Sequence, residues 1–533
     1  MADYKSTLNI TQTSFPMKAN LPTTEPERVR FWEGMDLYRE LRRKGEGRPK
    51  FILHDGPPFA NGDIHMGHLL NKVLKDVIVK YKGLAGFDAP YVPGWDCHGM
   101  PIEHRVMGDL GAKARSMSKV DIRSACREYA LKFVDRQREQ FKRLGVAGEW
   151  SNPYLTMSSE YESKIVEAFH HMLKEGYITR GMRPILWCPL CRTALAEAEV
   201  EYADHESTSV TVAFPVKSLP AGVLPKTPRE RLFILIWTTT PWTLPANLGI
   251  SLHPGFHYVT VKVGDSHYLL AKDLLNATAG LCGWKDFTVV EEVEGRALDR
   301  AVCRHAFLEK DSLVMVGEHV TADAGTGCVH TAPGHGREDY EIGLRYGLEI
   351  YSPVDEAGCF DERVPEWKGM NVFDANEKVV EKLRESGRLL AVERIRHSYP
   401  HCWRSKNPVI FRATTQWFID IDHQDLRKRA LEAVRDVKWI PSWGEERITN
   451  MVAARVDWCI SRQRSWGVPI AAFTCSQCHA VLVDGKVNAQ IAALVRQEGI
   501  DGWFRKENAD ILPPGTSCRC GSTARRRRAA CRP

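Results

Sequence analysis

Residues 51–68 read Phe-Ile-Leu-His-Asp-Gly-Pro-Pro-Phe-Ala-Asn-Gly-Asp-Ile-His-Met-Gly-His, and this stretch decides how the rest of the chain is placed. Its apolar beginning, followed by Asp-Gly-Pro-Pro, is typical of a buried strand that ends in a turn. Farther on, apolar residues recur at helical spacing over 70–81 with lysines between them, which predicts an amphipathic helix. We therefore expect a strand, a loop rich in glycine and proline, and a helix that begins near His65 and His68.

The two histidines are candidates for binding an anion. The start of a helix attracts negative charge because its free N–H groups point outward. His65 and His68 are three residues apart and share a helical face, and Gly67 leaves the backbone between them uncovered. A pair of surface histidines without a function is the alternative interpretation. Zinc is disfavoured, because no third ligand of evident spacing lies beside them.

The uninterrupted run of strand, Gly-Pro-Pro, Asn-Gly, His-Met-Gly-His and helix resembles the first signature of class I aminoacyl-tRNA synthetases. The resemblance implies that His65, Gly67 and His68 form a catalytic site. The histidines would hold the phosphates of ATP, which binds with Mg²⁺, and would stabilise charge at the α-phosphate as an amino acid attacks it. The fold class that it implies is α/β: a Rossmann-type doubly wound parallel sheet, incomplete in this chain, interrupted by an inserted β-barrel-like editing domain.

A second loop, Gly-Trp-Asp-Cys-His-Gly-Met-Pro-Ile-Glu at residues 94–103, follows a proline-bounded segment that we expect to be a strand. Ligands of doubly wound sheets bind beyond the carboxyl ends of the strands. Asp96 is therefore a candidate to hold a substrate ammonium, or else a turn residue that caps the next segment. The loop resembles the isoleucyl branch of the family, which implies that Pro57 and Asp96 bind L-isoleucine. Residues 457–470 resemble the same branch, although Arg462, Arg464 and Trp466 equally fit a solvated helix end.

The composition is that of an ordinary globular protein, with 43% hydrophobic and 26% charged residues in a chain of 533. No apolar run has the length of a signal peptide or a membrane span, so we expect a cytoplasmic protein without a membrane partner. We also expect a monomer. The net charge of +6 comes from six arginines in residues 519–533, which leaves 67 basic and 67 acidic residues elsewhere. RNA binding therefore cannot be argued from bulk charge and needs a local patch.

Fifteen cysteines are many for a cytoplasmic enzyme, and their clustering favours metal sites over disulfides. Cys188 and Cys191 form one Cys-x-x-Cys knuckle, and Cys402 adds a thiol with Ser405 where a fourth cysteine would complete a zinc site. His401 or water would then complete the set, and a knuckle packed without metal is the alternative. A second candidate Zn²⁺ site combines two short motifs, of which the later is one residue shorter than a zinc ribbon requires: Cys475, Cys478, Cys518 and Cys520.

Between Cys191 and Cys402, short strands replace helices, which predicts an all-β module inserted in the α/β domain. We expect strands at 210–216, 232–239, 257–263, 268–271 and 287–293. Two loops in this module are dense in polar groups, one at 237–247 and one at 325–340. Taken singly, each is explained by strand propensity or by helix capping.

Together the two loops resemble the editing domain of isoleucyl, valyl and leucyl synthetases. That resemblance implies an editing pocket lined by six residues: Thr238, Thr239, Thr240, Thr243, Asn247 and His330. Asp339 would hold the α-ammonium of the wrong amino acid, and water would attack the ester because no nucleophilic serine or cysteine is implied. Isoleucine and valine differ by one methylene, which an apolar pocket separates only weakly, as is known from isoleucyl enzymes.

We expect an N-terminal extension at 1–50, the first half of the catalytic domain with its knuckle at 51–200, the editing domain at 201–394, a return to the catalytic domain at 395–472, a zinc-ribbon insert at 473–520 and a basic tail at 521–533. The tail has no apolar periodicity, so we interpret it as a frame change or a truncated reading rather than as an RNA-binding segment. The second signature of the family, Lys-Met-Ser-Lys-Ser, does not occur in the sequence, and the similar residues 115–119 lie too early in the chain.

The resemblance therefore implies the N-terminal portion of an enzyme that attaches L-isoleucine to the tRNA for isoleucine. The reaction would use ATP, pass through an isoleucyl-adenylate and be followed by hydrolytic editing of valyl products. We expect the chain by itself to form adenylate poorly. Two rival classes are an editing-only hydrolase and an inactive fragment that binds tRNA or zinc. Pyrophosphate exchange, deacylation of mischarged tRNA and metal content distinguish the three.

Overall fold

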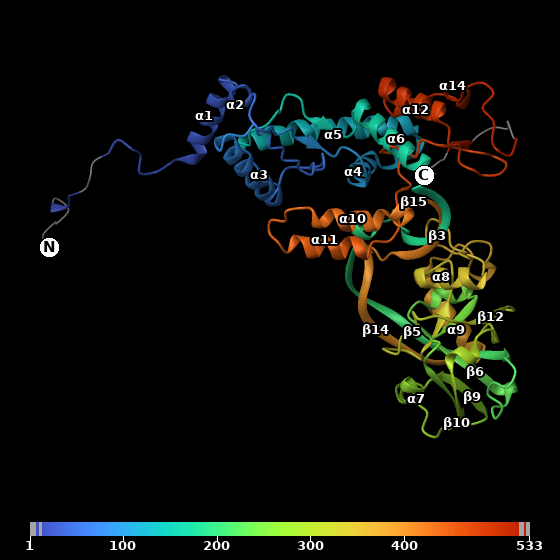
Figure 1. The fold of residues 1–533 in the computed structure, drawn as a ribbon. Coiled ribbons are helices and arrows are strands. Elements are labelled where there is room, and N and C mark those ends of the chain that lie inside the picture. The colour runs from blue at the N-terminus through green and yellow to red at the C-terminus, as the bar shows by residue number, and fades with distance from the viewer. Residues whose placement is uncertain (1–6, 10–12, 522–526, 529–533) are drawn as a thin grey trace. The chain divides into compact units, whose positions relative to one another are not determined.

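The computed structural model describes residues 7–9, 13–521 and 527–528 of the chain. Most of the arginine-rich segment 521–533 lies outside the described residues. The chain forms two compact units, residues 1–171 with 464–533 and residues 172–463 (Figure 1). The second unit contains all of segment 201–394, where the editing domain is predicted.

Helices dominate the first unit. The predicted amphipathic helix is α3 (Met66–Leu84), and two long helices farther along the chain are α5 (Lys119–Arg143) and α6 (Ser159–Lys174). The other helices of this unit are α1 (Leu21–Gly34), α2 (Leu37–Gly45), α4 (Met100–Leu110), η2 (Gly111–Ser116), α12 (Gly485–Glu498), α13 (Asp501–Arg505) and α14 (Asn508–Ile511).

Three chain segments run parallel in the first unit, as a Rossmann half requires. β1 (Gly94–Trp95) pairs in parallel with β2 (Tyr154–Leu155). The segment expected to be a strand at 51–53 is extended, with single parallel bridges from Lys50 to Asp88 and from Phe59 to Asp96. Pro57 and Pro58 carry no N–H group, so this segment cannot form a continuous ladder. Near the other end of the chain, β17 (Phe473–Thr474) pairs with β18 (Arg527–Arg528).

The core of the first unit surrounds α5 and buries two tryptophans, Trp95 and Trp466. Arg123 on α5 is fully buried and donates hydrogen bonds to the carbonyls of Ser465 (2.7 Å) and Gly467 (2.8 Å). These bonds fix the returning segment against the first part of the chain, because an unpaired buried guanidinium is strongly unfavourable. A second apolar cluster packs α12 and α13 around Trp503.

The second unit is mainly β-structure. Its strands are β3 (Ile178–Cys188), β4 (Thr193–Ala194), β5 (Val200–Ser218), β6 (Leu232–Thr238), β7 (Gly249–Leu252), β8 (His257–Val263), β9 (Ser266–Ala271), β10 (Thr288–Glu294), β11 (Val302–Arg304), β12 (Asp311–Val316), β13 (Cys328–Thr331), β14 (Leu389–Cys402), β15 (Ile410–Ile419) and β16 (Trp458–Cys459). The five strands expected between Cys191 and Cys402 correspond to parts of β5, β6, β8, β9 and β10.

Six of these strands close into a barrel. The sheet order is β10-β8-β9-β6-β13-β7-β12-β11-β5-β14, and an additional pairing joins β6 to β5. This pairing closes a ring of β6, β13, β7, β12, β11 and β5, which removes sheet edges that would otherwise be open. The predicted β-barrel-like insert is therefore present, and β8, β9 and β10 extend it at one side (Figure 1).

Short 3₁₀ helices, labelled η, and α-helices complete the second unit. They are η3 (Glu197–Glu199), η4 (Arg229–Arg231), η5 (Pro241–Ala246), η6 (Lys272–Leu274), α7 (Leu275–Leu281), η7 (Gly295–Leu298), α8 (Arg337–Tyr346), η8 (Pro365–Trp367), α9 (Val372–Glu385), η9 (His423–Asp425), α10 (Leu426–Arg435) and α11 (Gly444–Ala453). β5 and β14 form a long antiparallel ribbon, and β16, β15, β3 and β4 form a separate antiparallel sheet. Within the described ranges, no helix combines the length and hydropathy that a membrane crossing needs.

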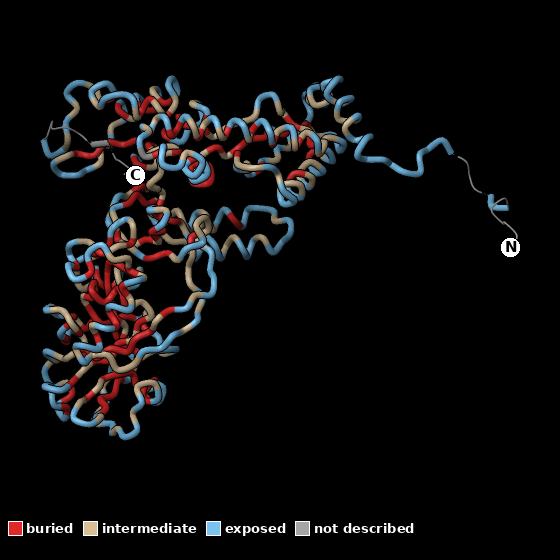
Figure 2. Tube along the Cα trace, turned by 180° about the vertical axis from the view of Figure 1, so that it is seen from behind, coloured by how far each residue is buried: buried red, intermediate tan, exposed pale blue. Residues whose placement is uncertain are grey.

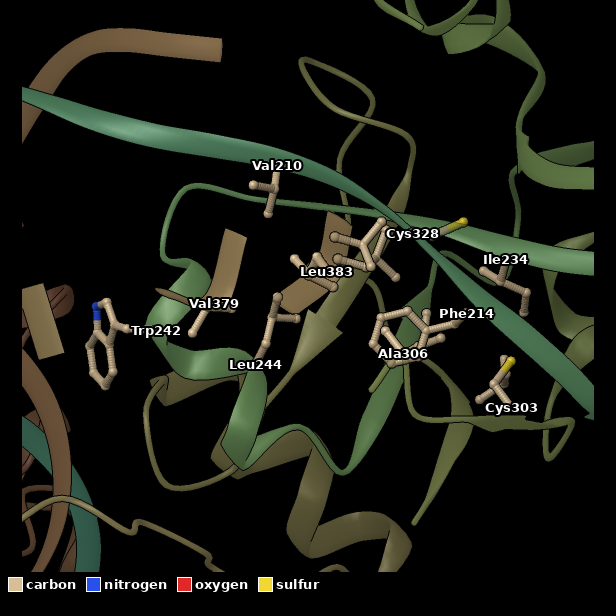
Figure 3. Close-up of a cluster of buried hydrophobic side chains, with 14 of the residues drawn as sticks. Val210, Phe214, Ile234, Trp242, Leu244, Cys303, Ala306, Cys328, Val379 and Leu383 are labelled. Carbon is tan, nitrogen blue, oxygen red and sulfur yellow. The ribbon is translucent and has the colours of Figure 1, made fainter. Parts of the chain in front are cut away.

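Buried residues concentrate inside the barrel, whereas much of the β5–β14 ribbon is exposed (Figure 2). The barrel core joins strand residues to residues from outside the ring. Figure 3 shows Leu244 of η5 in one cluster with Val379 and Leu383 of α9 and with Phe214 of β5. The turn after β6 is therefore anchored in the core through an apolar side chain.

Candidate functional site

The structure places His65 and His68 in the first turn of α3. His65 is the N-cap, and its Nδ1 accepts a hydrogen bond from the backbone N–H of Gly67 at 3.1 Å. The Nδ1 of His68 accepts in turn from the backbone N–H of His65 at 3.2 Å. Each ring satisfies a backbone donor that the helix start leaves free, and the ring centroids lie 4.0 Å apart.

Gly67 allows this arrangement because it has no side chain. A Cβ at position 67 would lie 2.9 Å from Cε1 of His65 and 3.1 Å from its Nδ1. Such contacts would push the ring of His65 away from the helix start. The absence of a side chain is thus a steric requirement of the histidine pair.

The pair presents donors to any anion at the helix start. Both Nδ1 atoms accept hydrogen bonds, so a neutral ring in either position carries its proton on Nε2. Partial burial, reinforced by His65 and Lys72, lowers the pKa of His68 and favours its neutral form. Two N–H donors beside free helix N–H groups can bind phosphate oxygens.

A buried ion-pair network holds the loop before this site to α3. Asp55 is 6% exposed and accepts hydrogen bonds from the amines of Lys72 and Lys75, both on α3. Tyr91 donates to Asp55 at 3.1 Å and lies 2.9 Å from the Lys72 amine. Burial acts to raise the pKa of Asp55, but the two lysines outweigh it and hold that pKa below its usual value.

Pro57 and Asp96 lie on adjacent chain segments. The backbone N–H of Asp96 donates to the carbonyl of Pro58 at 2.9 Å, next to Pro57. The Asp96 carboxylate accepts from the backbone N–H of His98 at 3.3 Å, and burial raises the pKa of Asp96. A desolvated carboxylate gains more from an ammonium partner than a hydrated one does.

Two of the three residues left open in segment 457–470, Arg462 and Trp466, have different surroundings. Arg462 forms an ion pair with Glu199 at 2.7 Å. Trp466 is 1% exposed and donates through Nε1 to the carbonyl of Cys97 at 2.7 Å. Its backbone N–H donates to Glu103 at 3.1 Å. Trp466 thus packs directly behind the loop that carries Asp96 and is not part of a solvated helix end.

The threonine loop is a hydrogen-bonded turn between β6 and β7. The hydroxyl oxygens of Thr238 and Thr240 lie 3.3 Å apart, as do those of Thr240 and Thr243. Thr243 donates its hydroxyl proton to the carbonyl of Thr240 at 2.8 Å. Thr238 and Thr243 are buried, whereas Thr239 and Thr240 are partly exposed.

His330 on β13 joins this loop to Asn247. Its Nε2 lies 2.9 Å from the hydroxyl of Thr243, and its Nδ1 lies 2.8 Å from the side-chain nitrogen of Asn247. The same Asn247 nitrogen donates to the carbonyl of Gly249 at 2.8 Å, which fixes the orientation of the amide. Burial lowers the pKa of His330 to about 3, so the ring is neutral at physiological pH.

Asp339 lies in the first turn of α8, three residues after the Gly334-His335-Gly336 run. Its carboxylate accepts from the backbone N–H of Ala332 at 2.8 Å, close to His330 in the chain. Gly336 makes room for the carboxylate, because a Cβ there would lie 2.9 Å from Cγ of Asp339. Burial raises the pKa of Asp339 to about 7.

A cavity of about 580 Å³ opens beside the threonine loop. Of the predicted editing residues, Thr239 and Thr240 line it, together with Trp242 of η5. Phe373 and Asn376 of α9 form another wall. Thr243, Asn247 and His330 lie in the buried layer to which Thr240 is hydrogen bonded.

Four thiols meet in the first unit: Cys475, Cys478, Cys518 and Cys520. The sulfurs of Cys475 and Cys520 are 3.8 Å apart, and those of Cys478 and Cys518 are 3.5 Å apart. A tetrahedral zinc with four thiolates has sulfurs about 3.8 Å apart, given Zn–S bonds of about 2.3 Å. The four residues therefore fit zinc, although the second motif is one residue shorter than expected for a ribbon.

Three thiols meet in the second unit: Cys188, Cys191 and Cys402. Ser405 occupies the fourth corner, with its hydroxyl 3.4 Å from the sulfur of Cys188. Serine is a poor ligand for zinc compared with a thiolate, so this cluster fits the metal less well.

Two features of these sites were missed by reasoning from the sequence. Asp55 and Lys72 carry no motif, and Lys72 stands among the lysines between the apolar residues of the helix, so the pattern did not mark it as buried. Ser312 on β12 donates to Asn247 at 2.8 Å, and a single serine in a strand gives no signal at all.

Comparisons with known proteins agree on one family. Residues 27–527 match the profile described as tRNA synthetases class I (I, L, M and V). The chain is 52% identical over 525 residues to the isoleucine–tRNA ligase of Syntrophomonas wolfei, covering 98% of this chain and 56% of that protein. It is 52% identical over 521 residues to the isoleucine–tRNA ligase of Kosmotoga olearia, with the same coverage of 98% and 56%. The chain thus spans about half the length of the curated relatives it matches.

Solved structures give weaker likenesses. One is described as the ternary complex of Agrobacterium radiobacter K84 agnB2 LeuRS with tRNA and LeuAMS, at 16% identity and a TM-score of 0.35, covering 88% of this chain and 53% of that chain. Another is GlLeuRS-CP1, at 14% identity and a TM-score of 0.27, covering 36% of this chain and 99% of that chain.

Proposed function

Since this chain belongs to the class I tRNA synthetases of the I, L, M and V group, we propose that it attaches L-isoleucine to the tRNA for isoleucine and edits valyl products. The observation that carries the choice of amino acid is the 52% identity to curated isoleucine–tRNA ligases over 98% of the chain. The chain covers 56% of the length of those relatives, so the activity of the complete enzyme is itself part of the proposal.

The first-unit site supports the ATP-dependent step. We infer that ATP binds with Mg²⁺ at the start of α3, where the Nε2–H groups of His65 and His68 donate to its phosphates. Negative charge grows on the phosphate oxygens when the carboxylate of isoleucine attacks, so donors held in place stabilise the transition state more than the ground state. Asp96 would hold the α-ammonium of the amino acid, and Pro57 would contact its side chain.

The second-unit site supports hydrolysis of a valyl ester. Asp339, once ionised, would bind the α-ammonium through a charge-assisted hydrogen bond. Thr239 and Thr240 lie at the cavity wall and would contact the substrate. His330 is neutral, and its Nδ1 accepts a hydrogen bond from Asn247, so we assign it to holding Thr243 and not to proton transfer. Water is then the attacking group.

We infer that Cys475, Cys478, Cys518 and Cys520 hold zinc. A zinc ion bound there would cross-link two loops that are about forty residues apart in sequence. Its contribution is to folding, because a site filled by four thiolates leaves no open position for a substrate. Cys188, Cys191 and Cys402 would bind zinc more weakly, with water or Ser405 completing the set.

Deacylation of valyl-tRNA for isoleucine by the purified chain tests the editing half of the proposal. We expect the chain to release valine, and Asp339→Ala to abolish release while the thermal unfolding midpoint stays near that of the parent. Glu341→Ala, at an exposed position on the same helix, is the matched control and should deacylate normally. Normal deacylation by Asp339→Ala would remove Asp339 from the assignment.

Isoleucine-dependent pyrophosphate exchange tests the other half, measured with the longest product that the gene encodes. We expect His65→Ala to lower exchange far more than it lowers isoleucine binding. Equal losses of exchange and binding would point to a folding role for His65. Deacylation without any exchange would favour the editing-only hydrolase over the complete synthetase.

A further inference from the structure

We propose that the hairpin of β11 and β12 positions the threonine loop, and that Ser312 acts through Asn247 on His330. The inference deepens the proposed editing function and rests on it. Three side chains of this hairpin donate hydrogen bonds to the loop: His305, Lys310 and Ser312. None of them belongs to either polar loop that the sequence singles out.

His305 holds the middle of the loop with a defined tautomer. Its Nδ1 accepts from the backbone N–H groups of Phe307 (3.1 Å) and Leu308 (3.0 Å). The ring proton therefore lies on Nε2, which donates to the carbonyl of Leu244 at 2.8 Å. Burial lowers the pKa of His305 to about 3, so this donor stays in place across the physiological range.

Lys310 and Ser312 hold the end of the loop. The amine of Lys310 donates to the carbonyl of Pro245 at 2.8 Å. The hydroxyl of Ser312 lies 2.8 Å from Oδ1 of Asn247, and an amide oxygen only accepts, so the serine must be the donor. Ser312 is fully buried, so its hydroxyl has no competing contact with solvent.

The bond from Ser312 starts a chain of donors with one direction. Asn247 turns its oxygen to Ser312 and its nitrogen to His330, whose Nδ1 must then accept. A neutral ring that accepts at Nδ1 donates from Nε2, here to the hydroxyl of Thr243. The hydroxyl of Thr243 donates a hydrogen bond to the carbonyl of Thr240, a residue that lines the cavity. The order of donors therefore runs from the hairpin to the cavity wall.

The opposite face of the loop packs on α9 and makes one hydrogen bond to it, from the backbone N–H of Trp242 to Oδ1 of Asn376 at 3.1 Å. Leu244 is fully buried against Val379 and Leu383 of α9 (Figure 3). Apolar contacts fix how deep the turn sits but not how its polar groups point, because they have no direction. The three hairpin donors fix the direction of the carbonyls of Leu244 and Pro245 and of the Asn247 amide, which makes them positioning residues for groups that would contact substrate.

Steady-state deacylation of valyl-tRNA for isoleucine by the full chain tests the proposal. We expect Ser312→Ala to lower kcat about tenfold, the change expected when one buried hydrogen bond worth about 1.4 kcal/mol is lost, with KM unchanged. Ser163→Ala is the matched control, because Ser163 is also fully buried and donates to the carbonyl of Ala492 in the first unit. The control should unfold slightly more easily and deacylate at the parent rate.

Lys310 gives a second arm at a position that is partly exposed. We expect Lys310→Met to lower kcat about fivefold, and Lys310→Arg to restore most of the loss because it keeps a donor. In an Asn247→Ala background, Ser312→Ala should cause no further loss, since its effect passes through Asn247. Additive losses, or a parent-like kcat for both Ser312→Ala and Lys310→Met, would overturn the proposal.

The ¹⁵N shifts of the His330 ring, assigned by comparison with His330→Gln, provide a readout that does not need activity. We expect an accepting Nδ1 and a protonated Nε2 in the parent chain, and a mixture of tautomers in Ser312→Ala. An unchanged tautomer in that variant would overturn the inference even if the chain deacylates. If the parent chain does not deacylate, the proposed editing function fails, and the ring shifts still decide the role of Ser312.

Discussion

The Nδ1 of His330 lies 2.8 Å from the side-chain nitrogen of Asn247, and that nitrogen also donates to the carbonyl of Gly249. The contact decides what the histidine can do. An imidazole whose Nδ1 accepts and whose Nε2 donates to Thr243 has no lone pair left to take a proton from water. The histidine therefore organises the pocket, and the titrating group near it is the carboxyl of Asp339.

The pH dependence of deacylation should follow Asp339. Its pKa is raised to about 7, and only the carboxylate can hold a substrate ammonium, so kcat/KM should rise with pH up to about 7. The substrate ammonium loses its own proton at about pH 7.7, which gives a falling limb above that. Asp339→Asn should remove the rising limb. His330 variants should scale the profile without moving it, since the pKa of His330 is about 3. A limb that moves in a His330 variant would contradict the role given to His330.

Gly67→Ala should impair the ATP-dependent site without unfolding the chain. A Cβ at position 67 would lie 2.9 Å from the His65 ring and would break the cap that sets its direction. We expect pyrophosphate exchange to fall about tenfold or more, with the thermal unfolding midpoint little changed. Gly83→Ala on the same helix is the control, because a Cβ there meets nothing within 4 Å. Equal exchange rates for the two variants would show that the His65 ring need not be held.

The sequence predicted whole elements better than it predicted contacts. Helix α3, which begins near His65 and His68, and five strands of the second unit follow from periodicity and from turn residues. Closure of the barrel does not follow, because it depends on the pairing of β6 with β5, which no local pattern records. The strand expected at 51–53 forms single bridges only, since tertiary pairing decides whether an extended segment becomes a ladder.

In the candidate sites too, residues that belong to a motif were predicted from the sequence, whereas isolated residues that support them were not. Motif residues such as His330 and Asn247 were found because they stand in dense polar loops. Ser312 was not found, since one serine in a strand has the same local pattern whether it supports a site or not. The four thiols of the first unit were grouped from the sequence, although their spacing argued against a ribbon, and the structure brings their sulfurs to distances that fit a tetrahedral metal.

Metal content should differ between the two cysteine clusters. We expect the purified chain to carry zinc at its four-thiol cluster, and Cys478→Ser to lose that zinc. Ser405→Cys should add a second, tightly held zinc, because position 405 already lies against Cys188. Zinc per chain after a fixed exposure to chelator, measured by mass spectrometry, checks both. Ser386→Cys should add none, because Ser386 precedes the start of β14 whereas Cys402 is at its end. A parent chain that already holds two chelator-resistant zincs would contradict the ranking.

The buried pair of Asp55 and Lys72 should be the most sensitive polar contact of the first unit. Asp55 is 6% exposed and Lys72 is 3% exposed, and they join the loop before Pro57 to the helix that carries His65. Asp55→Asn leaves the Lys72 ammonium buried without a countercharge, which lowers the free energy of unfolding by about 3–5 kcal/mol. Lys72→Met should cost less, because Lys75 still pairs with Asp55.

Two further measurements separate this pair from a general packing effect. The double variant Asp55→Asn/Lys72→Met should be more stable than Asp55→Asn alone, since no charge is then left buried. Because the pKa of Asp55 is lowered in the folded chain, its contribution is present above its ordinary pKa of about 3.9 and is lost as pH falls through the folded value, so the parent and Asp55→Asn should converge in acid. Glu40→Gln, in an exposed pair with Arg43, is the control and should change stability little. If Asp55→Asn is as mild as that control, the network does not hold the loop to α3, and the direction of His65 must be set by its own cap alone.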